Sequence, residues 1–291
     1  MTTGLIVNAD DFGLTSGVNR AIIELHAAGV LTSATLMARA AATDKAIEIA
    51  KATPSLGVGC HLVLVDGEPV RSAEKDIPAI SDGKQHFLPK LGQFLARIHT
   101  RSVADVQREI EMEARAQLEL LLSRGVRLTH IDTHKHTHMF PRVLRPVLRA
   151  AGSCGIRAVR NPFEPAWSVR STPSAPLTRR QQVRLLRLLE RRFRRIVAEE
   201  GFVTTEGAIG VLATGTLDAG SVAALVRAMP QDGKIYELVT HPGYNDADLA
   251  RVSTRLRQSR ETEREALLGL RAAPNLELIS FAGLQQTQTV D

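Results

Sequence analysis

The stretch Leu5-Ile6-Val7-Asn8-Ala9-Asp10-Asp11-Phe12-Gly13 is an apolar run that ends in two adjacent carboxylates. It predicts a buried strand over Leu5–Ala9, because aliphatic and β-branched residues favour extended, packed backbone. Ser16 then opens a predicted helix that runs to about Ala28 and ends at Gly29, a typical cap and stop. The chain therefore begins with a strand, a polar turn and a helix.

Outward from this unit, short apolar runs alternate with helical patterns along the whole chain. Further strands are predicted at Ser33–Met37, Gly57–Leu64, Leu128–Thr133, Ala158–Arg160, Ala208–Ala213, Ile235–Thr240 and Leu276–Ser280. Further helices are predicted from Thr43 to before Pro54 and at Val103–Arg124, Pro141–Ala151, Thr178–Glu200, Ala219–Ala228 and Thr254–Ala272. Such alternation predicts parallel strands joined by right-handed crossovers.

About eight strand–helix units in one chain of this length predict an α/β fold of the (β/α) barrel type, related to the TIM barrel and not necessarily regular. An open doubly wound sheet is the competing architecture. Nothing resembles an interdomain linker, so we expect residues 1–291 to form a single domain. Two insertions, Asp66–Thr100 and Asn161–Pro176, follow predicted strands, where parallel-sheet enzymes build substrate loops.

The composition excludes several classes of protein. Apolar residues make up 44% and charged residues 23%, which excludes wholesale disorder. Aromatic residues are only 4%, which argues against a nucleic-acid partner bound by base stacking. The net charge of +6 permits anionic partners without selecting one. Two cysteines distant in sequence, no secretory signal and no apolar run of about 18 residues predict a cytoplasmic protein.

Polar residues that can carry chemistry occur on or after several predicted strands. Asp10 and Asp11 repel each other unless a cation lies beside them, although either can instead cap the following helix. His61 is the one histidine of an apolar strand, where a core role is the alternative. Its neighbour Cys60 faces the other side of the sheet, so Cys60 is not a ligand candidate. His241 ends another strand and is held before Pro242-Gly243, and a structural loop histidine is the alternative.

The segment Thr129–His138 carries four of the nine histidines of the chain. Its alternation predicts that Asp132, His134, His136 and His138 share one side of an extended chain; a solvated strand edge is the alternative. In a barrel, the carboxyl ends of the strands converge on one face. The combined residues indicate a divalent cation held by one carboxylate and two imidazoles, with a second carboxylate and a remote histidine to move protons. Such a set of residues indicates metal-assisted hydrolysis.

These residues resemble the YdjC-like carbohydrate deacetylases, which remove N-acetyl groups from amino sugars. The resemblance rests on Asn8–Gly13, Leu31–Thr35, Pro54–Gly59 leading into His61, Thr129–Pro141 and His241–Tyr244. It implies a barrel-like domain, often a homodimer, with one Mg or Zn ion. It also implies Asp11, His61 and His134 as metal ligands, Asp10 as general base, and His241 as general acid or stabiliser of the tetrahedral intermediate.

Leu62–Val70 and Arg160-Asn161-Pro162 are similar to the hopanoid-biosynthesis-associated branch of this family. That resemblance implies an N-acetylglucosaminyl-hopanoid as substrate. We expect His136 and Arg160 to contact the sugar. Deacetylation of soluble chitooligosaccharides and a non-catalytic metal- or sugar-binding protein on the same fold are the alternatives.

The segment Thr178–Glu200 combines eight arginines with leucine, phenylalanine and isoleucine at helical spacing. It predicts a cationic amphipathic helix that can lie on an anionic membrane, peripherally at the inner membrane surface. The alternative is an ordinary outer helix of the barrel that packs its apolar side on the sheet. The apolar residues of this segment are Leu185, Leu186, Leu189, Phe193 and Ile196.

Overall fold

The computed structural model describes the chain except for residues 1, 173–174, 271–275 and 288–291. Its strands are β1 (Thr3–Phe12), β2 (Ser33–Leu36), β3 (Gly57–Leu62), β4 (Leu128–Thr133), β5 (Ala158–Val159), β6 (Val203–Thr204), β7 (Gly207–Ile209), β8 (Ile235–Thr240) and β9 (Leu276–Leu278). They form one parallel sheet in the order β6-β5-β4-β3-β2-β1-β8-β7, and β9 also pairs with β1.

The order of the strands is that of a ring. Each strand from β2 to β6 lies beside its predecessor, and β1 lies between β2 and β8. The sheet edges are β6 and β7, which only residues 205–206 separate in the chain. An open doubly wound sheet would instead reverse its strand order at a switch point. The curled, barrel-like fold predicted from the sequence is confirmed.

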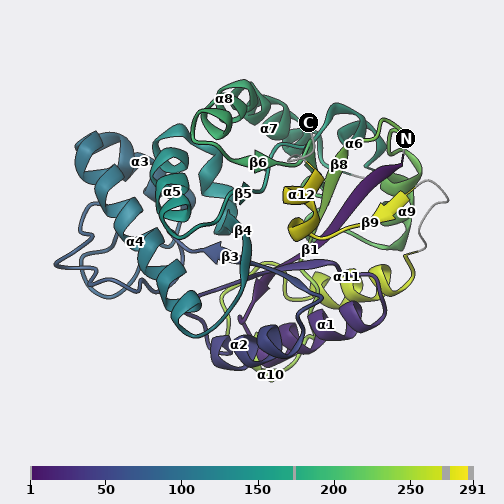
Figure 1. Ribbon diagram of the computed structural model, residues 1–291, viewed down its shortest axis with the longest axis horizontal. Helices are drawn as coiled ribbons and strands as arrows, with labels where there is room; N and C mark the ends of the chain where they lie inside the picture. The colour runs from purple at the N-terminus through teal and green to yellow at the C-terminus, as the bar shows by residue number, and fades with distance from the viewer. Residues whose placement is uncertain (1, 173–174, 271–275, 288–291) are drawn as a thin grey trace.

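Helices surround the strands (Figure 1). They are α1 (Ser16–Ala27), α2 (Thr43–Ala52), α3 (Leu91–Thr100), α4 (Val103–Ser123), α5 (Pro141–Ser153), α6 (Ala166–Ser171), α7 (Leu177–Leu186), α8 (Glu190–Glu199), α9 (Ala219–Arg227), α10 (Ala247–Ala250), α11 (Ser259–Leu268) and α12 (Phe281–Thr287). Two 3₁₀ segments are η1 (His134–Met139) and η2 (Arg187–Leu189). Every residue of β1 is buried, as expected for a parallel strand covered on both faces.

Several element boundaries differ from the predictions. Thr15, and not Ser16, caps α1, because the Thr15 hydroxyl accepts the backbone N–H of Val18. The strand predicted at Ala208–Ala213 ends at Ile209, because Gly210 adopts a φ of 83° and turns the chain. The elements β6 and α3 were not predicted, since two residues are too few for a strand pattern and α3 lies inside an insertion.

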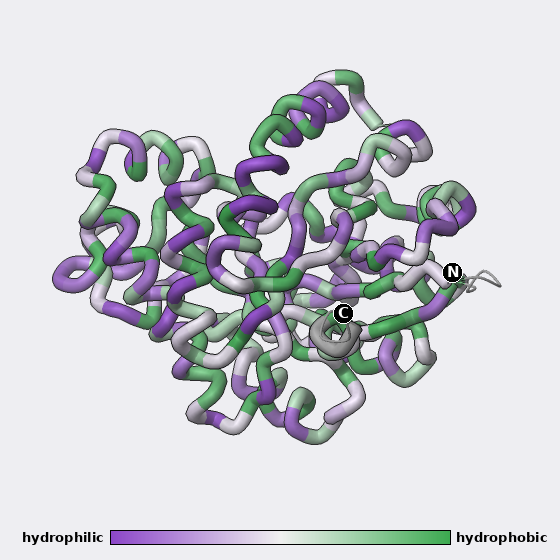
Figure 2. Tube along the Cα trace, turned by 45° about the horizontal axis from the view of Figure 1, so that its top comes forward, coloured by the Kyte–Doolittle hydropathy of each residue, from purple (hydrophilic) through white to green (hydrophobic). Residues whose placement is uncertain are grey.

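Two predicted helices also differ from the structure. The helix predicted at Thr254–Ala272 begins only at Ser259, and its last two predicted positions lie outside the described residues. The predicted helix Thr178–Glu200 is divided by η2 into α7 and α8. In Figure 2, α7 projects from the top of the molecule and mixes hydrophobic with hydrophilic turns.

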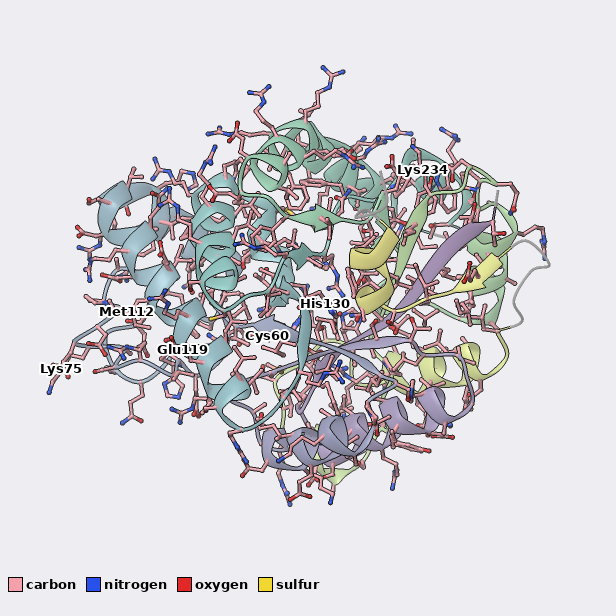
Figure 3. The ribbon with its side chains drawn as sticks, viewed as in Figure 1. Cys60, Lys75, Met112, Glu119, His130 and Lys234 are labelled. Carbon is pink, nitrogen blue, oxygen red and sulfur yellow. The ribbon has the colours of Figure 1, made fainter. Side chains whose placement is uncertain are left out.

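Helix α12 closes the end of the barrel at which the strands begin. Phe281 is fully buried and stacks on His130, with ring centroids 3.8 Å apart. Figure 3 labels His130 beside α12. Ile6, Ala158 and Leu284 complete this small apolar cluster. Gly59 belongs to the same arrangement, because a Cβ there would lie 2.5 Å from the His130 ring. The opposite, carboxyl end of the strands is therefore the end at which a site can open.

Candidate metal and catalytic site

The first strand delivers both of its carboxylates to the carboxyl end of the barrel. In a regular strand, neighbouring side chains point to opposite faces. Here the register with β2 shifts between Ala9 and Phe12, and Asp11 adopts a φ of 63°. This left-handed residue turns the backbone, so that Asp10 and Asp11 both contact side chains from the other strand ends.

Asp11, His61 and His134 bring three potential ligand atoms together. The Asp11 Oδ1 atom lies 3.4 Å from His61 Nε2 and 3.6 Å from His134 Nδ1. The two imidazole nitrogens are 3.3 Å apart. Ligand atoms at about 2.1 Å from one shared ion are separated by about 3.0–3.5 Å in octahedral or tetrahedral geometry. The spacing and the donor set therefore fit one divalent cation.

Asp132 orients His61 for this role. Its Oδ1 atom lies 2.8 Å from His61 Nδ1, so the imidazole donates its Nδ1 proton there and directs the Nε2 lone pair at Asp11 and His134. A carboxylate behind a ligand histidine is the usual support in metal sites. Burial alone lowers the pKa of His61, but Asp132, Asp10 and Asp11 raise it to about 9. These carboxylates therefore favour positive charge at His61 Nε2, supplied by a proton when no cation is bound and by a cation that would take its place.

Arg160 holds Asp10 in its ionised form. The guanidinium donates to both Asp10 oxygens, at 2.6 and 2.9 Å. Burial raises the pKa of Asp10, but the charge and hydrogen bonds of Arg160 together with the charge of His61 outweigh it and keep the pKa below its ordinary value. The same guanidinium pairs with Asp132 and Glu237. Arg160 has no exposed surface, a position that favours an internal role over the predicted contact with a sugar.

His241 lies on the other side of Asp10. Its Nε2 atom is 3.7 Å from Asp10 Oδ2, and its backbone N–H donates to Glu263 Oε2 at 2.7 Å. The ring keeps about a tenth of its surface exposed. A carboxylate and a histidine therefore lie next to each other, close to the three ligand atoms. This arrangement can accept a proton at one group and deliver one from the other.

The prediction of an extended chain from Asp132 to His138 is wrong beyond Thr133. The chain turns into η1, with Lys135 and His136 at φ values of 55° and 51°. The turn leaves His134 at the ligand cluster and sends His138 inward, where its Nε2 donates to the Arg160 carbonyl at 3.1 Å. His138 is consequently a structural residue.

His136 is half-buried, and its Nδ1 atom has no hydrogen-bond partner among the described residues. Burial, helped by the Arg160 charge, lowers the pKa of His136 to about 3. The ring is therefore neutral, and its Nδ1 atom is buried without a partner in the described part of the chain rather than open to solvent. Its contact with a sugar stays a prediction.

Three charged residues of the site were missed by sequence reasoning. Arg260 donates to Asp11 Oδ2 at 2.5 Å, and Glu263 contacts His241 from the same helix, α11. Neither stands out in a polar helical segment. Glu237 gave a signal, since it is the one charged residue of the apolar strand β8 and is fully buried.

Known proteins resemble this chain over most of its length. The family model of YdjC-like proteins matches residues 4–277. A carbohydrate deacetylase from Brevibacillus brevis is 36% identical over 263 residues, which is 90% of each chain. A chitooligosaccharide deacetylase from Salmonella typhimurium is 36% identical over 152 residues, which is 52% of this chain and 57% of that protein.

Solved structures share the fold. A putative cellobiose-phosphate cleavage protein from Enterococcus faecalis superposes with a TM-score of 0.75 at 22% identity, over 98% of this chain and 99% of that one. A lactam utilization protein from Thermus thermophilus gives a TM-score of 0.50 at 14% identity, over 95% and 99%. The match to the family model and the relative from Brevibacillus, together with the assembled Asp and His residues, lead to one conclusion: this chain belongs to the YdjC-like protein family.

Proposed function

We propose that this protein is a carbohydrate N-deacetylase, a hydrolase that removes the N-acetyl group from an amino sugar. The observation that carries the proposal is one cluster: the ligand atoms of Asp11, His61 and His134 lie 3.3–3.6 Å apart beside the Asp10–His241 pair. A binding protein needs neither a base nor an acid at such a cluster. The relatives named as carbohydrate deacetylases support the same reaction.

Asp11, His61 and His134 would hold one divalent cation, either Mg or Zn. When bound, the cation supplies positive charge that polarises the acetyl carbonyl and makes a nearby water more acidic. One carboxylate with two imidazoles suits Zn, and the hard carboxylate also accepts Mg, so the ligand set does not select between them.

The remaining steps belong to the side chains around the cluster. Asp10, kept ionised by Arg160, accepts the proton of the attacking water. His241 gives a proton from Nε2 to the departing sugar amine, because it adjoins Asp10 on the exposed side of the site. His136 contacts the sugar with its neutral imidazole, while Arg160 keeps Asp10 in place from behind.

Acetate release from diacetylchitobiose, measured beside the metal content of the purified protein, tests this proposal. We expect His134→Ala and Asp11→Asn to lose bound metal and activity together, and Asp10→Asn to lose about 10²–10⁴ in rate while keeping the metal. His99→Ala, at an exposed histidine of α3, is the matched control and should change neither. Unchanged turnover by metal-stripped protein would refute the mechanism. Metal and sugar binding without acetate release would favour the non-catalytic alternative.

We further propose that the amino sugar is lipid-linked, as in a hopanoid glycolipid, and that the segment Thr178–Glu200 contacts an anionic membrane. The structure exposes Leu177, Leu185 and Leu188 by 77, 67 and 76%, and α7 has no buried residue. By contrast, α8 buries Phe193, Ile196 and Val197. The predicted apolar side thus divides into a buried part and an exposed part.

Exposed arginines lie along the same side of the segment as the exposed leucines. Here the term α7 ridge denotes a row of exposed residues that begins in α7, continues through η2 into α8 and recurs at helical spacing. Its members are Leu177, Gln181, Arg184, Leu185, Leu188, Arg191, Arg192 and Arg195. None of them is acidic, and the combination of leucines with arginines suits the interface of an anionic bilayer. A two-fold dimer through this ridge would instead bring its arginines close to their own copies. Within the described residues, no helix has the length and apolar character needed to span a bilayer.

The α7 ridge is tied to the rim of the site. Arg179, on the inner side of α7, donates to the carbonyls of Thr214 and Val211 at 2.9 and 3.2 Å. Both carbonyls lie in the loop that follows β7, at the carboxyl end of the barrel. A membrane bound to the ridge would therefore lie close to the opening of the site, where a headgroup sugar can enter.

Flotation with phosphatidylcholine vesicles, with and without phosphatidylglycerol, tests the membrane contact. We expect the protein to bind only the anionic vesicles and to dissociate at high salt. Leu185→Gln/Leu188→Gln should weaken binding about tenfold, from lost apolar burial. Val103→Gln is the control, because Val103 is an exposed apolar residue of α4 (46%) that lies outside this segment. If the protein dimerises and the double variant abolishes the dimer, the ridge is instead the contact with a second copy. The homodimer and the cytoplasmic location remain predictions.

A further inference from the structure

Glu263 is a buried carboxylate that reaches the site from outside the barrel. It lies on α11 with 1% of its surface exposed. Its Oε2 atom accepts the backbone N–H of His241 at 2.7 Å, and its Oε1 atom accepts the backbone N–H of Gly215 at 3.4 Å. The residue thus joins α11 to the loops that follow β7 and β8.

The same carboxylate faces the His241 side chain. The Nδ1 atom of His241 lies 3.8 Å from Glu263 Oε2 and has no hydrogen-bond partner among the described residues. The other ring nitrogen, Nε2, faces Asp10 Oδ2 at 3.7 Å. Each nitrogen of the ring is therefore opposed by a different carboxylate, one in the site and one behind it. Distances of this length commonly shorten when substrate binds.

We propose that Glu263 is a positioning residue for His241: its carboxylate keeps a proton on Nδ1, so that Nε2 is the nitrogen that exchanges protons in the site. An acceptor opposite Nδ1 favours the tautomer with hydrogen there, and negative charge stabilises the imidazolium once Nε2 is protonated. The part played by His241 in turnover rests on the proposed deacetylase function. The tautomer itself is a property of the protein without substrate.

The alternative is that Glu263 serves only to tie two loops to α11. Charge separates the two roles, because glutamine retains a carbonyl oxygen that accepts the His241 and Gly215 N–H groups but carries no negative charge. The charged groups around the pair are Arg260 on the same helix and Asp10 on the far side of His241. Arg260 is itself bound to Asp11, so its charge is already shared.

Glu164 offers a matched control. It is 1% exposed and accepts the backbone N–H groups of Gly210 and Leu212 at 3.3 and 2.6 Å, again in the loop after β7. Its side-chain partner is the Ser168 hydroxyl rather than a histidine. Glu164→Gln therefore repeats the loss of charge at a loop anchor without touching an imidazole.

The test compares wild type, Glu263→Gln, Glu263→Asp and Glu164→Gln by ¹⁵N NMR of the imidazole nitrogens, with His241 assigned from His241→Gln. We expect His241 in the wild type to show a protonated Nδ1, and Glu263→Gln to shift the ring toward the other tautomer. Glu263→Gln should also lower kcat about 10²-fold, with KM little changed and the limb of the pH profile assigned to His241 displaced. Glu263→Asp should recover part of each effect.

One outcome overturns this proposal, and a different one overturns the proposed function. Glu263→Gln spectra and pH profile equal to wild type, with the same loss of thermal stability as Glu164→Gln, would leave Glu263 a loop anchor only. A wild type that releases no acetate but whose His241 tautomer follows Glu263 would remove the proposed function and leave this inference standing. The two failures are therefore distinguishable.

Discussion

Arg160 is the residue around which the charges of the barrel interior are arranged. Its guanidinium contacts Asp10, Asp132 and Glu237, and each of the four side chains is at most 3% exposed. Through Asp10 it supports the proposed base, and through Asp132 it supports a ligand histidine. Removal of one partner of a buried ion pair costs more than the pair contributes, because the remaining charge has no compensation.

The first prediction at this scale follows from that burial. Arg160→Met should lower the free energy of unfolding by about 3–5 kcal/mol, since three carboxyl groups lose their counter-charge. Urea unfolding measures this loss. Arg251→Met removes an exposed arginine that pairs with Asp248 on the surface and should change stability little. Equal midpoints for the two variants would contradict the assigned role of Arg160.

A second prediction concerns pH. Burial raises the pKa of Glu237 to about 7, although Arg160 opposes the shift. The folded protein therefore holds this proton more tightly than the unfolded chain, so the stabilising contribution is complete below the ordinary pKa of 4.5 and is lost as the pH rises through about 7. Stability should fall between pH 5 and pH 8 in the wild type and fall less in Glu237→Gln, as measured by thermal unfolding across that range. Identical slopes would exclude Glu237 as the source.

At the scale of elements, the loop after β3 and the 3₁₀ segment η1 position the ligand residues jointly. Lys135 follows His134 directly, and its ammonium group donates to Asp66 Oδ2 at 2.6 Å. Both residues adopt left-handed backbone, with φ values of 55° and 57°. Such backbone is unfavourable for residues other than glycine, so the ion pair holds two strained turns together beside the cluster.

The corresponding prediction is a loss of metal affinity without a loss of fold. Asp66→Ala should weaken binding of the divalent cation about 10- to 100-fold, because His134 loses its support. Titration calorimetry of metal-stripped protein measures this. The pair is about one-third exposed, so the unfolding midpoint should change little. Glu48→Ala, which breaks the exposed Lys45–Glu48 pair, should leave affinity unchanged. A large fall in stability with normal affinity would refute the interpretation.

At the scale of the whole molecule, the two ends of the barrel have different tasks. The carboxyl end collects Asp10, Asp11, His61, His134 and His241, whereas α12 fills the other end. Phe281→Ala should therefore reduce the free energy of unfolding by about 3–5 kcal/mol and leave KM and metal affinity near wild-type values. Unfolding measurements and kinetics below the transition temperature check both parts. A specific loss of metal affinity would show that the two ends are coupled.

The sequence by itself determined the features that depend on neighbours along the chain. Apolar runs, caps and glycine stops predicted the alternating strands and helices, and strand-end polar residues predicted Asp10, Asp11, His61 and His241 as site candidates. The periodicity failed at His134–His138, because the left-handed turn at Lys135 is stabilised by Asp66, 69 residues earlier.

Only the tertiary structure decided which groups stand behind the site. Arg160, Glu237, Arg260 and Glu263 act on Asp10, Asp11 and His241 from strands and helices up to 249 residues away. It also decided that Leu185 faces outward while Phe193 packs inward. Burial and long-range charge contacts depend on how the elements pack, and local sequence patterns carry no record of that packing.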